Sequence, residues 1–137
     1  MANSKSIGVA YSDQDIRGAD FLYADSEIGY TAAARGAVTQ LTDKATAVTL
    51  NKSAGTITMN GALLAAATNA NFTLNNSLIS AGDAVILSIV GGTATPGTYT
   101  LWTTGLTTGS ATITLRNITA GNLSEAVVFN FVILHAL

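Results

Sequence analysis

Apolar and polar side chains alternate along most of this chain, and no other feature constrains its fold as strongly. In residues 110–116, for example, Ala111, Ile113 and Leu115 alternate with serine, threonine and arginine. A period of two places one set of side chains on a core and the other in water, which indicates β-strands covered on one face. Threonine suits the wet face because its branched Cβ favours extended backbone and its hydroxyl is hydrated.

This alternation predicts eight strands. They cover residues 38–42, 46–51, 56–60, 71–75, 84–90, 98–101, 110–116 and 126–134. Glycine-containing turn sequences separate them at 53–55, 81–83, 91–92, 96–97, 108–109 and 120–122. Asn60-Gly61 is a hairpin signal, and the alanine- and leucine-rich stretch 62–67 favours a short helical turn or a packed loop. Short strands at regular spacing predict an all-β fold, an antiparallel, jelly-roll-like β-sandwich, rather than βαβ units.

Charged side chains are scarce and unevenly placed. They make up 10% of the 137 residues, against roughly 25% in an average soluble domain. Residues 1–36 hold eight of them and residues 37–137 hold six, while Thr31 is the only threonine before residue 37. This change in composition divides the chain into an extended N-terminal arm, residues 1–36, and a β-sandwich body, residues 37–137. On the alternating strands of the body, threonine and asparagine take the place of charge.

The predicted arm carries many large apolar side chains but no sustained period. Its start, Ile7, Val9 and Tyr11, alternates and predicts one short strand. So much apolar surface argues against a simply disordered tail, so the arm either lies over its own body or reaches a neighbouring subunit or a host surface. The expected contact residues of the arm are Ile7, Val9, Tyr11, Ile16, Phe21, Leu22, Tyr23, Ile28 and Tyr30.

Two predicted strands, 84–90 and 126–134, are apolar on both faces. A strand of this kind lies centrally under two layers or at a subunit contact. Because a second sheet covers only one face, we favour a subunit contact, with cover by the N-terminal segment as the alternative. Trp102 lies on the threonine side of its strand, which favours packing against a loop or a partner over stacking on a carbohydrate. The expected subunit interface residues are Ile86, Val90, Trp102, Val128, Val132 and Leu134.

The residues offer no catalytic or metal-binding constellation. The chain has no cysteine, and its only histidine is His135, which we interpret as a terminal surface or interface residue rather than part of a triad. Asp13 and Asp15 have the spacing of the start of a calcium loop, but Arg17 occupies a ligand position and Ala24 stands where the closing glutamate is required. We therefore expect no enzyme activity, no catalytic residues, no metal and no cofactor.

Charge and hydropathy also argue against two classes of partner. The net charge is −2 and no basic stripe is present to neutralise phosphates, so we expect no nucleic-acid partner. No uninterrupted apolar run approaches the roughly 18–20 residues of a membrane helix, so we expect no membrane partner.

Several distinctive stretches carry a resemblance to a known family. They are residues 6–11, 36–40, 46–52, 55–59, 72–77 and 113–127. In these stretches the chain resembles short virion proteins of tailed bacteriophages, in particular capsid decoration (cement) and head-fibre proteins. The resemblance implies a homotrimer made in the bacterial host cytoplasm that binds the major capsid protein on the head surface of the virion and stabilises the head. The rival that it also implies is a trimeric head-fibre, tail-fibre or spike module involved in host-surface attachment.

Overall fold

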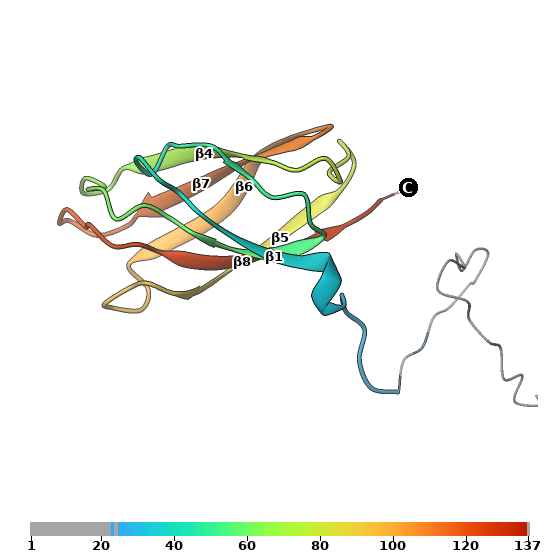
Figure 1. Cartoon of the computed structure of the whole chain (residues 1–137). Helices are drawn as coiled ribbons and strands as arrows, with labels where there is room; N and C mark the ends of the chain where they lie inside the picture. Colours follow the sequence, from blue (N-terminus) through green and yellow to red (C-terminus); the bar gives the residue numbers. More distant parts are fainter. Residues whose placement is uncertain (1–22, 24, 137) are drawn as a thin grey trace, which may run out of the picture.

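The computed structural model of this chain describes residue 23 and residues 25–136, in which eight strands form two four-stranded sheets (Figure 1). A short 3₁₀ helix, η1 (Ala32–Ala34), precedes β1 (Arg35–Thr39), β2 (Val48–Thr49), β3 (Ala54–Thr58), β4 (Asn69–Asn75), β5 (Ala84–Gly91), β6 (Tyr99–Thr107), β7 (Ser110–Asn117) and β8 (Val128–Leu134). Sheet A has the order β1-β3-β8-β5 and sheet B the order β2-β4-β7-β6. The prediction of an all-β fold is confirmed, and the two layers are those of a β-sandwich.

Successive strands run in opposite directions, and every connection except the β6–β7 hairpin crosses from one sheet to the other. Two odd-numbered or two even-numbered strands that become neighbours must therefore be parallel. This is the case for β1 beside β3 and for β2 beside β4. The remaining pairs are antiparallel. The expectation of a purely antiparallel sandwich was wrong at these two pairs, because alternation along a strand carries no information about its neighbours.

The alternating directions give the sandwich two distinct ends. We call "the entry end" the one that holds residues 23–34 before β1, the connections 50–53, 76–83 and 108–109, and residues 135–136 after β8. "The loop end" holds the connections 40–47, 59–68, 92–98 and 118–127. Figure 1 shows the blue N-terminal segment and the C-terminus leaving the body at the same end.

The core lies between the sheets and is built from the apolar members of the alternating strands. Sheet A contributes Phe129 and Phe131, which are fully buried, and sheet B contributes Leu74 and Ile113. The rings of Phe72 and Phe129 meet across the layers with their centroids 6.1 Å apart, within the range that favours aromatic pairs. The predicted inward faces of these strands are therefore the observed ones.

At two positions, neighbouring atoms approach the main chain so closely that only glycine fits. A Cβ on Gly55 would lie 2.7 Å from Leu50 Cδ2 and 2.9 Å from the Phe131 ring. Gly92 has a φ of +73°, and a Cβ there would lie 1.9 Å from the Ala126 carbonyl oxygen. The predicted turn at 53–55 was wrong because Ala54 and Gly55 begin β3, where the missing side chain lets Leu50 pack against the strand.

Other observed element boundaries differ from the predicted ones because of local hydrogen bonds and packing. The first strand is shifted towards the N-terminus relative to 38–42, because the buried Gln40 side chain turns the chain by donating to the carbonyl of Thr46 at 2.8 Å. Asn60-Gly61 forms no hairpin, because Asn60 Oδ1 accepts the Ala62 amide at 2.8 Å in a local turn. Residues 62–67 form the packed loop rather than a helical turn, with Leu64 bridged to Leu123.

The predicted arm, residues 1–36, overlaps the body by two residues, since β1 begins at Arg35. The short strand predicted around Ile7, Val9 and Tyr11 lies outside the described residues. Within the part of the chain that the structure describes, no helix is long and apolar enough to cross a membrane.

Candidate interaction surface

The outer face of sheet A is aliphatic where β8 and β5 pair. Its large side chains point away from the core, and Ile86 lies directly opposite Val132 in the register of the two strands. The exposed fractions are 55% for Ile86, 54% for Val90, 37% for Val132 and 59% for Leu134. Together with the half-buried Val128, these residues form what we call "the aliphatic face". In the isolated chain, the two-sided strands are thus covered on one side only.

A polar belt divides the aliphatic face. Asn130 points outward from β8, accepts the hydroxyl of Thr56 at 2.7 Å and lies opposite Ser88 of β5. Val132, Leu134 and Ile86 lie on the entry-end side of this belt, and Val90 and Val128 lie on the other side.

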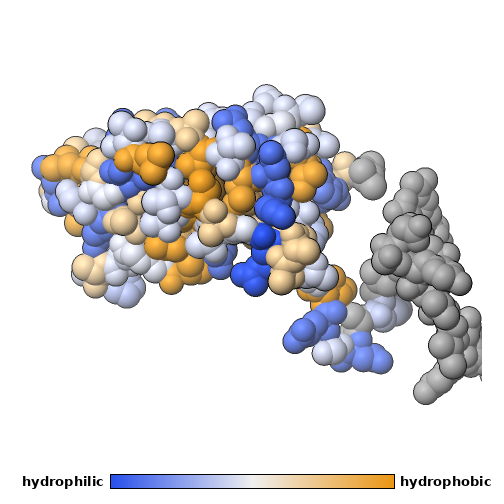
Figure 2. Space-filling model, viewed as in Figure 1, coloured by the Kyte–Doolittle hydropathy of each residue, from blue (hydrophilic) through white to orange (hydrophobic). Residues whose placement is uncertain are grey.

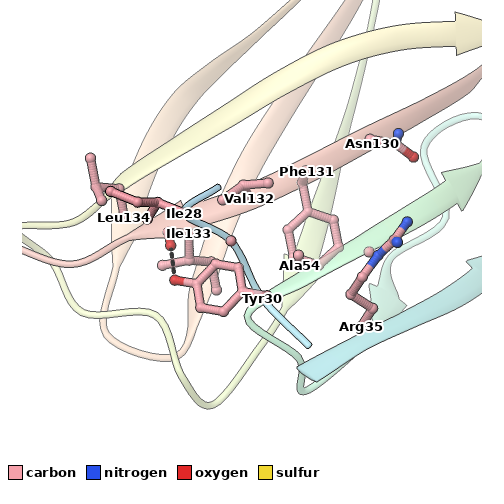
Figure 3. Close-up of a pocket in the computed structure, with 11 residues that line it drawn as sticks. Ile28, Tyr30, Arg35, Ala54, Asn130, Phe131, Val132, Ile133 and Leu134 are labelled. Carbon is pink, nitrogen blue, oxygen red and sulfur yellow. Dashed lines mark hydrogen bonds between the residues drawn. The ribbon is translucent and has the colours of Figure 1, made fainter. Parts of the chain in front are cut away.

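A groove runs along the entry-end part of the aliphatic face, between β8 and the segment that leads into η1 (Figure 3). It encloses about 590 Å³. Residues 28–30 form one wall, and Ala54, Val132 and Leu134 contribute to the other. Arg35 lines the same groove and makes no ion pair with a described residue. The groove is therefore apolar, with a single cationic group beside it.

One hydrogen bond fixes this segment to the sheet. Tyr30 Oη donates to the main-chain carbonyl of Ile133 at 2.6 Å, as the dashed line in Figure 3 shows. The Ile133 amide donates to the Ser53 carbonyl at 2.8 Å, just before β3 begins. The Ile133 carbonyl therefore lies beyond the end of the β3–β8 ladder, and the tyrosine supplies the donor that the ladder lacks.

The structure places only some of the predicted arm contacts. Tyr23 and Ile28 are exposed and Tyr30 is partly exposed, with the last two at the groove. The remaining predicted contacts, Ile7, Val9, Tyr11, Ile16, Phe21 and Leu22, lie outside the described residues.

Trp102 does not lie with the other predicted interface residues. It projects from the outer face of sheet B, opposite Thr114 of β7, and is 37% exposed. Around it the sheet surface is polar and internally bonded, since Thr114 donates to Asn71 at 2.7 Å and lies 3.0 Å from the Thr104 hydroxyl. The predicted interface set is thus divided between two opposite faces of the sandwich.

Figure 2 shows the distribution of hydropathy over one face of the body. On the visible face, orange apolar residues are separated largely by pale residues of intermediate hydropathy, with strongly hydrophilic residues only in places.

His135 is paired with a buried carboxylate. Its Nδ1 lies 2.9 Å from Asp83 Oδ2, which also accepts the Ser80 amide at 2.8 Å. The Ser80 amide lowers the pKa of Asp83 below its ordinary value, and the hydrogen bond from His135 adds to this effect. Among the described residues no hydroxyl is hydrogen-bonded to the histidine ring. The arrangement therefore ties the C-terminal residues to the 80–83 turn, and sequence reasoning missed the pair because 52 positions separate its members.

A second buried polar cluster lies at the loop end. Lys44 Nζ donates to the carbonyls of Asn60 and Glu125, both at 2.5 Å, and burial lowers the pKa of this lysine while the nearby Glu125 carboxylate opposes the change. Burial raises the pKa of Tyr99 to about 12, and the same carboxylate adds to the rise. Neither the Tyr99 hydroxyl nor Glu125 Oε2 has a hydrogen-bond partner among the described residues. We interpret this cluster as structural, because it joins the connections 40–47, 59–68 and 118–127 at the loop end.

Within the described residues, no group of three or more histidine, cysteine, aspartate or glutamate side chains is placed to hold a metal ion. The aliphatic face and the groove beside it are the strongest candidate site among the described residues. In comparisons with protein-family models, with curated proteins and with solved structures, no match to this chain was found.

Proposed function

We propose that this protein is a bacteriophage capsid decoration (cement) protein that binds the outer surface of the major capsid shell as a homotrimer and stabilises the head. The observation that supports this most is the aliphatic face, in which Ile86 and Leu134 are more than half exposed. On the entry-end side of the polar belt, Ile86, Val132 and Leu134 lie next to one another, and a contiguous exposed apolar patch favours a protein contact. In the proposal, Ile86, Val90, Val128, Val132 and Leu134 meet a second copy, and the remaining expected interface residue, Trp102, meets a loop or partner on sheet B.

The two ends of the sandwich support a polarity for this assembly. The N-terminal segment and the C-terminus leave from the entry end, and the four crossing loops lie at the other end. We therefore place the arm, residues 1–36, against the capsid or a neighbouring subunit, with the loop end facing outward. A jelly-roll-like topology is part of the proposal, because nearly every connection crosses between the sheets. The implied location is the head surface of the virion, after synthesis in the bacterial cytoplasm, with no nucleic-acid or membrane partner and no enzyme activity.

The thermal stability of decoration-free capsids tests this function. Added wild-type protein should bind the capsids and raise their melting temperature. The double variant Ile86→Lys/Val132→Lys should remain folded but lose both trimer formation and capsid stabilisation, because four-carbon ammonium side chains cannot pack at an aliphatic contact. The matched control is Thr49→Lys/Asn75→Lys, in which the two residues are also directly opposite each other but are exposed on sheet B away from Trp102; it should retain both. Failure of the wild-type protein to bind at any salt concentration would overturn the proposal.

One observation favours a second function, a trimeric head-fibre, tail-fibre or spike module that attaches to the host surface. Trp102 stands partly exposed on a sheet face of threonine and asparagine, a setting in which an aromatic ring can stack on a sugar. This function predicts that the protein binds host cells and that Trp102→Ala abolishes the binding. Virions that lack the protein and adsorb normally to cells would exclude it.

A further inference from the structure

We propose that the outer face of sheet B binds a saccharide that carries a carboxylate, with the Trp102 ring against the sugar and the Arg116 guanidinium on the acid. This inference gives a ligand class to the second function, attachment to the host surface, and in that respect it rests on that function. It does not depend on capsid binding, and the partner of Trp102 in it is a sugar rather than a protein.

Arg116 is the only charged residue in the four strands of sheet B. It is exposed and makes no ion pair with a described residue. Its Nη1 donates to Asn69 Oδ1 at 3.4 Å, which is a long and therefore weak hydrogen bond. A guanidinium presents a planar fork of N–H donors that matches the two oxygens of a carboxylate. Although the chain has a net charge of −2, these strands thus offer an anion a cation with no competing carboxylate.

The register of the strands places Arg116 next to the tryptophan. Trp102 of β6 lies opposite Thr114 of β7, and Arg116 follows two residues later on β7, so the side chains of Trp102 and Arg116 share the outer face. Diagonal neighbours of this kind lie roughly 7–8 Å apart, a separation that aromatic and long side chains can bridge. The ring and the guanidinium can therefore contact one bound sugar together.

Asparagine side chains of β4 extend this surface on the other side of β7. Asn71 lies opposite Thr114, and Asn69 lies opposite Arg116. The buried Thr114 hydroxyl donates to Asn71 Oδ1 at 2.7 Å, which orders the amide. The NH2 group of Asn71 donates to no described residue, so it is available to a sugar hydroxyl. Beside the ring and the cation there are thus ordered amide groups, which fix the orientation of a small ligand.

The balance of apolar and polar groups favours a sugar over a protein surface. A protein contact draws on contiguous apolar area, whereas here a single ring, 37% exposed, stands among hydroxyl and amide groups. A sugar ring has an apolar C–H face that can lie on an aromatic ring, and its hydroxyl groups can bond to the asparagines. A carboxylate on that sugar would complete the match by pairing with Arg116.

The chain's own fluorescence tests the site, because Trp102 is its only tryptophan. Full-length protein is titrated with sialyllactose and with a trisaccharide of galacturonic acid. Each acid is compared with its methyl ester, which keeps the sugar but removes the charge. We expect at least one acid to change the Trp102 emission saturably, with a Kd about fivefold or more below that of its ester. High salt should weaken the binding of the acid but not that of the ester, because it screens exposed charges.

Two matched variants assign the preference for the acid to one residue. Arg116→Gln should bind the acid and its ester equally, whereas Arg35→Gln, which removes the other arginine of the described residues, should keep the preference of the wild type. Trp102→Ala should lose binding of both forms, measured by saturation transfer in the ligand's NMR spectrum. Circular dichroism checks that each variant is folded.

Equal affinities for acid and ester in the wild type would overturn the proposal, and so would an unaltered preference in Arg116→Gln. No saturable change of the Trp102 emission with either acid would also overturn it. Binding to host cells is measured separately. Protein that binds cells but neither acid would refute this inference alone, and protein that binds an acid but no cells would refute the attachment function alone.

Discussion

Tyr30 and Ile133 are 103 positions apart in the sequence and are joined by a 2.6 Å hydrogen bond from the phenol to the main-chain carbonyl. This bond satisfies a carbonyl that lies beyond the β3–β8 ladder, and it fixes the N-terminal segment over the groove on the aliphatic face. The same contact therefore supplies a donor at the end of the β3–β8 ladder and shapes the candidate interaction surface.

Removing the Tyr30 hydroxyl tests this anchor. Tyr30→Phe keeps the ring but leaves the Ile133 carbonyl without its donor, and the net loss for such a bond is about 0.5–1.5 kcal/mol. We expect the free energy of unfolding, measured in urea, to fall by this amount. Hydrogen exchange of the amides of residues 28–31 should also become faster. Unchanged stability together with unchanged exchange would mean that the bond does not hold the segment.

Gly92 provides a prediction about the loop end. Gly92→Ala combines a left-handed backbone, which costs about 1–2 kcal/mol for an L-residue, with a Cβ only 1.9 Å from the Ala126 carbonyl. Gly97 is a matched control, because its φ is +80° but a Cβ there has no neighbour within 4 Å. In thermal unfolding, Gly97→Ala should lower the melting temperature modestly, whereas Gly92→Ala should lower it much more or prevent folding. Equal losses would contradict the close approach of Gly92 to Ala126.

Tyr99 predicts a loss of stability in alkali. Its pKa is raised from 10.0 to about 12 in the folded chain, so the unfolded chain releases the proton first as the pH rises. The stability linked to this group is present below pH 10 and is lost as the pH rises from about 10 to 12. Tyr99→Phe should weaken that alkaline decline and leave stability at pH 7 unchanged or higher, because it removes a buried hydroxyl without a partner. Urea unfolding across this pH range measures the effect, and an unaltered decline would contradict it.

Asp83 predicts a loss of stability in acid. Its folded pKa is below the ordinary 3.8, so its contribution is present above that value and disappears as the pH falls through the folded pKa. Asp83→Asn should lower stability at pH 7, because the carboxylate that accepts from Ser80 and His135 is lost. It should also reduce the fall in stability below pH 4. A variant with the same acid-unfolding curve as the wild type would show that the pair does not contribute.

Much of the sandwich follows from the sequence, because alternation depends only on which side chains face the core. Residues 71–75 and 110–116 were predicted within a residue or two of β4 and β7. Strand order, the two parallel pairs and the pairing of Asp83 with His135 depend instead on contacts between distant positions, which no local pattern encodes. The two-sided pattern of 84–90 and 126–134 identified the aliphatic face in advance, but Trp102 was grouped with residues of the opposite sheet.

Val132 tests the aliphatic face itself. Because its side chain points outward and is 37% exposed, Val132→Asp should leave the fold intact while preventing subunit contact, where an unpaired carboxylate would be buried at a cost of several kcal/mol. Circular dichroism and light scattering after gel filtration measure the two properties separately. A soluble oligomer like the wild type's would contradict the proposed interface.

Electron cryomicroscopy of decoration-free capsids mixed with an excess of this protein tests whether the protein decorates the head. We expect added density on the outer capsid surface in groups of three copies, with the N-terminal segments at the shell and the loop ends outward. Bare capsids at saturating protein, or density confined to the tail or to fibres, would contradict it.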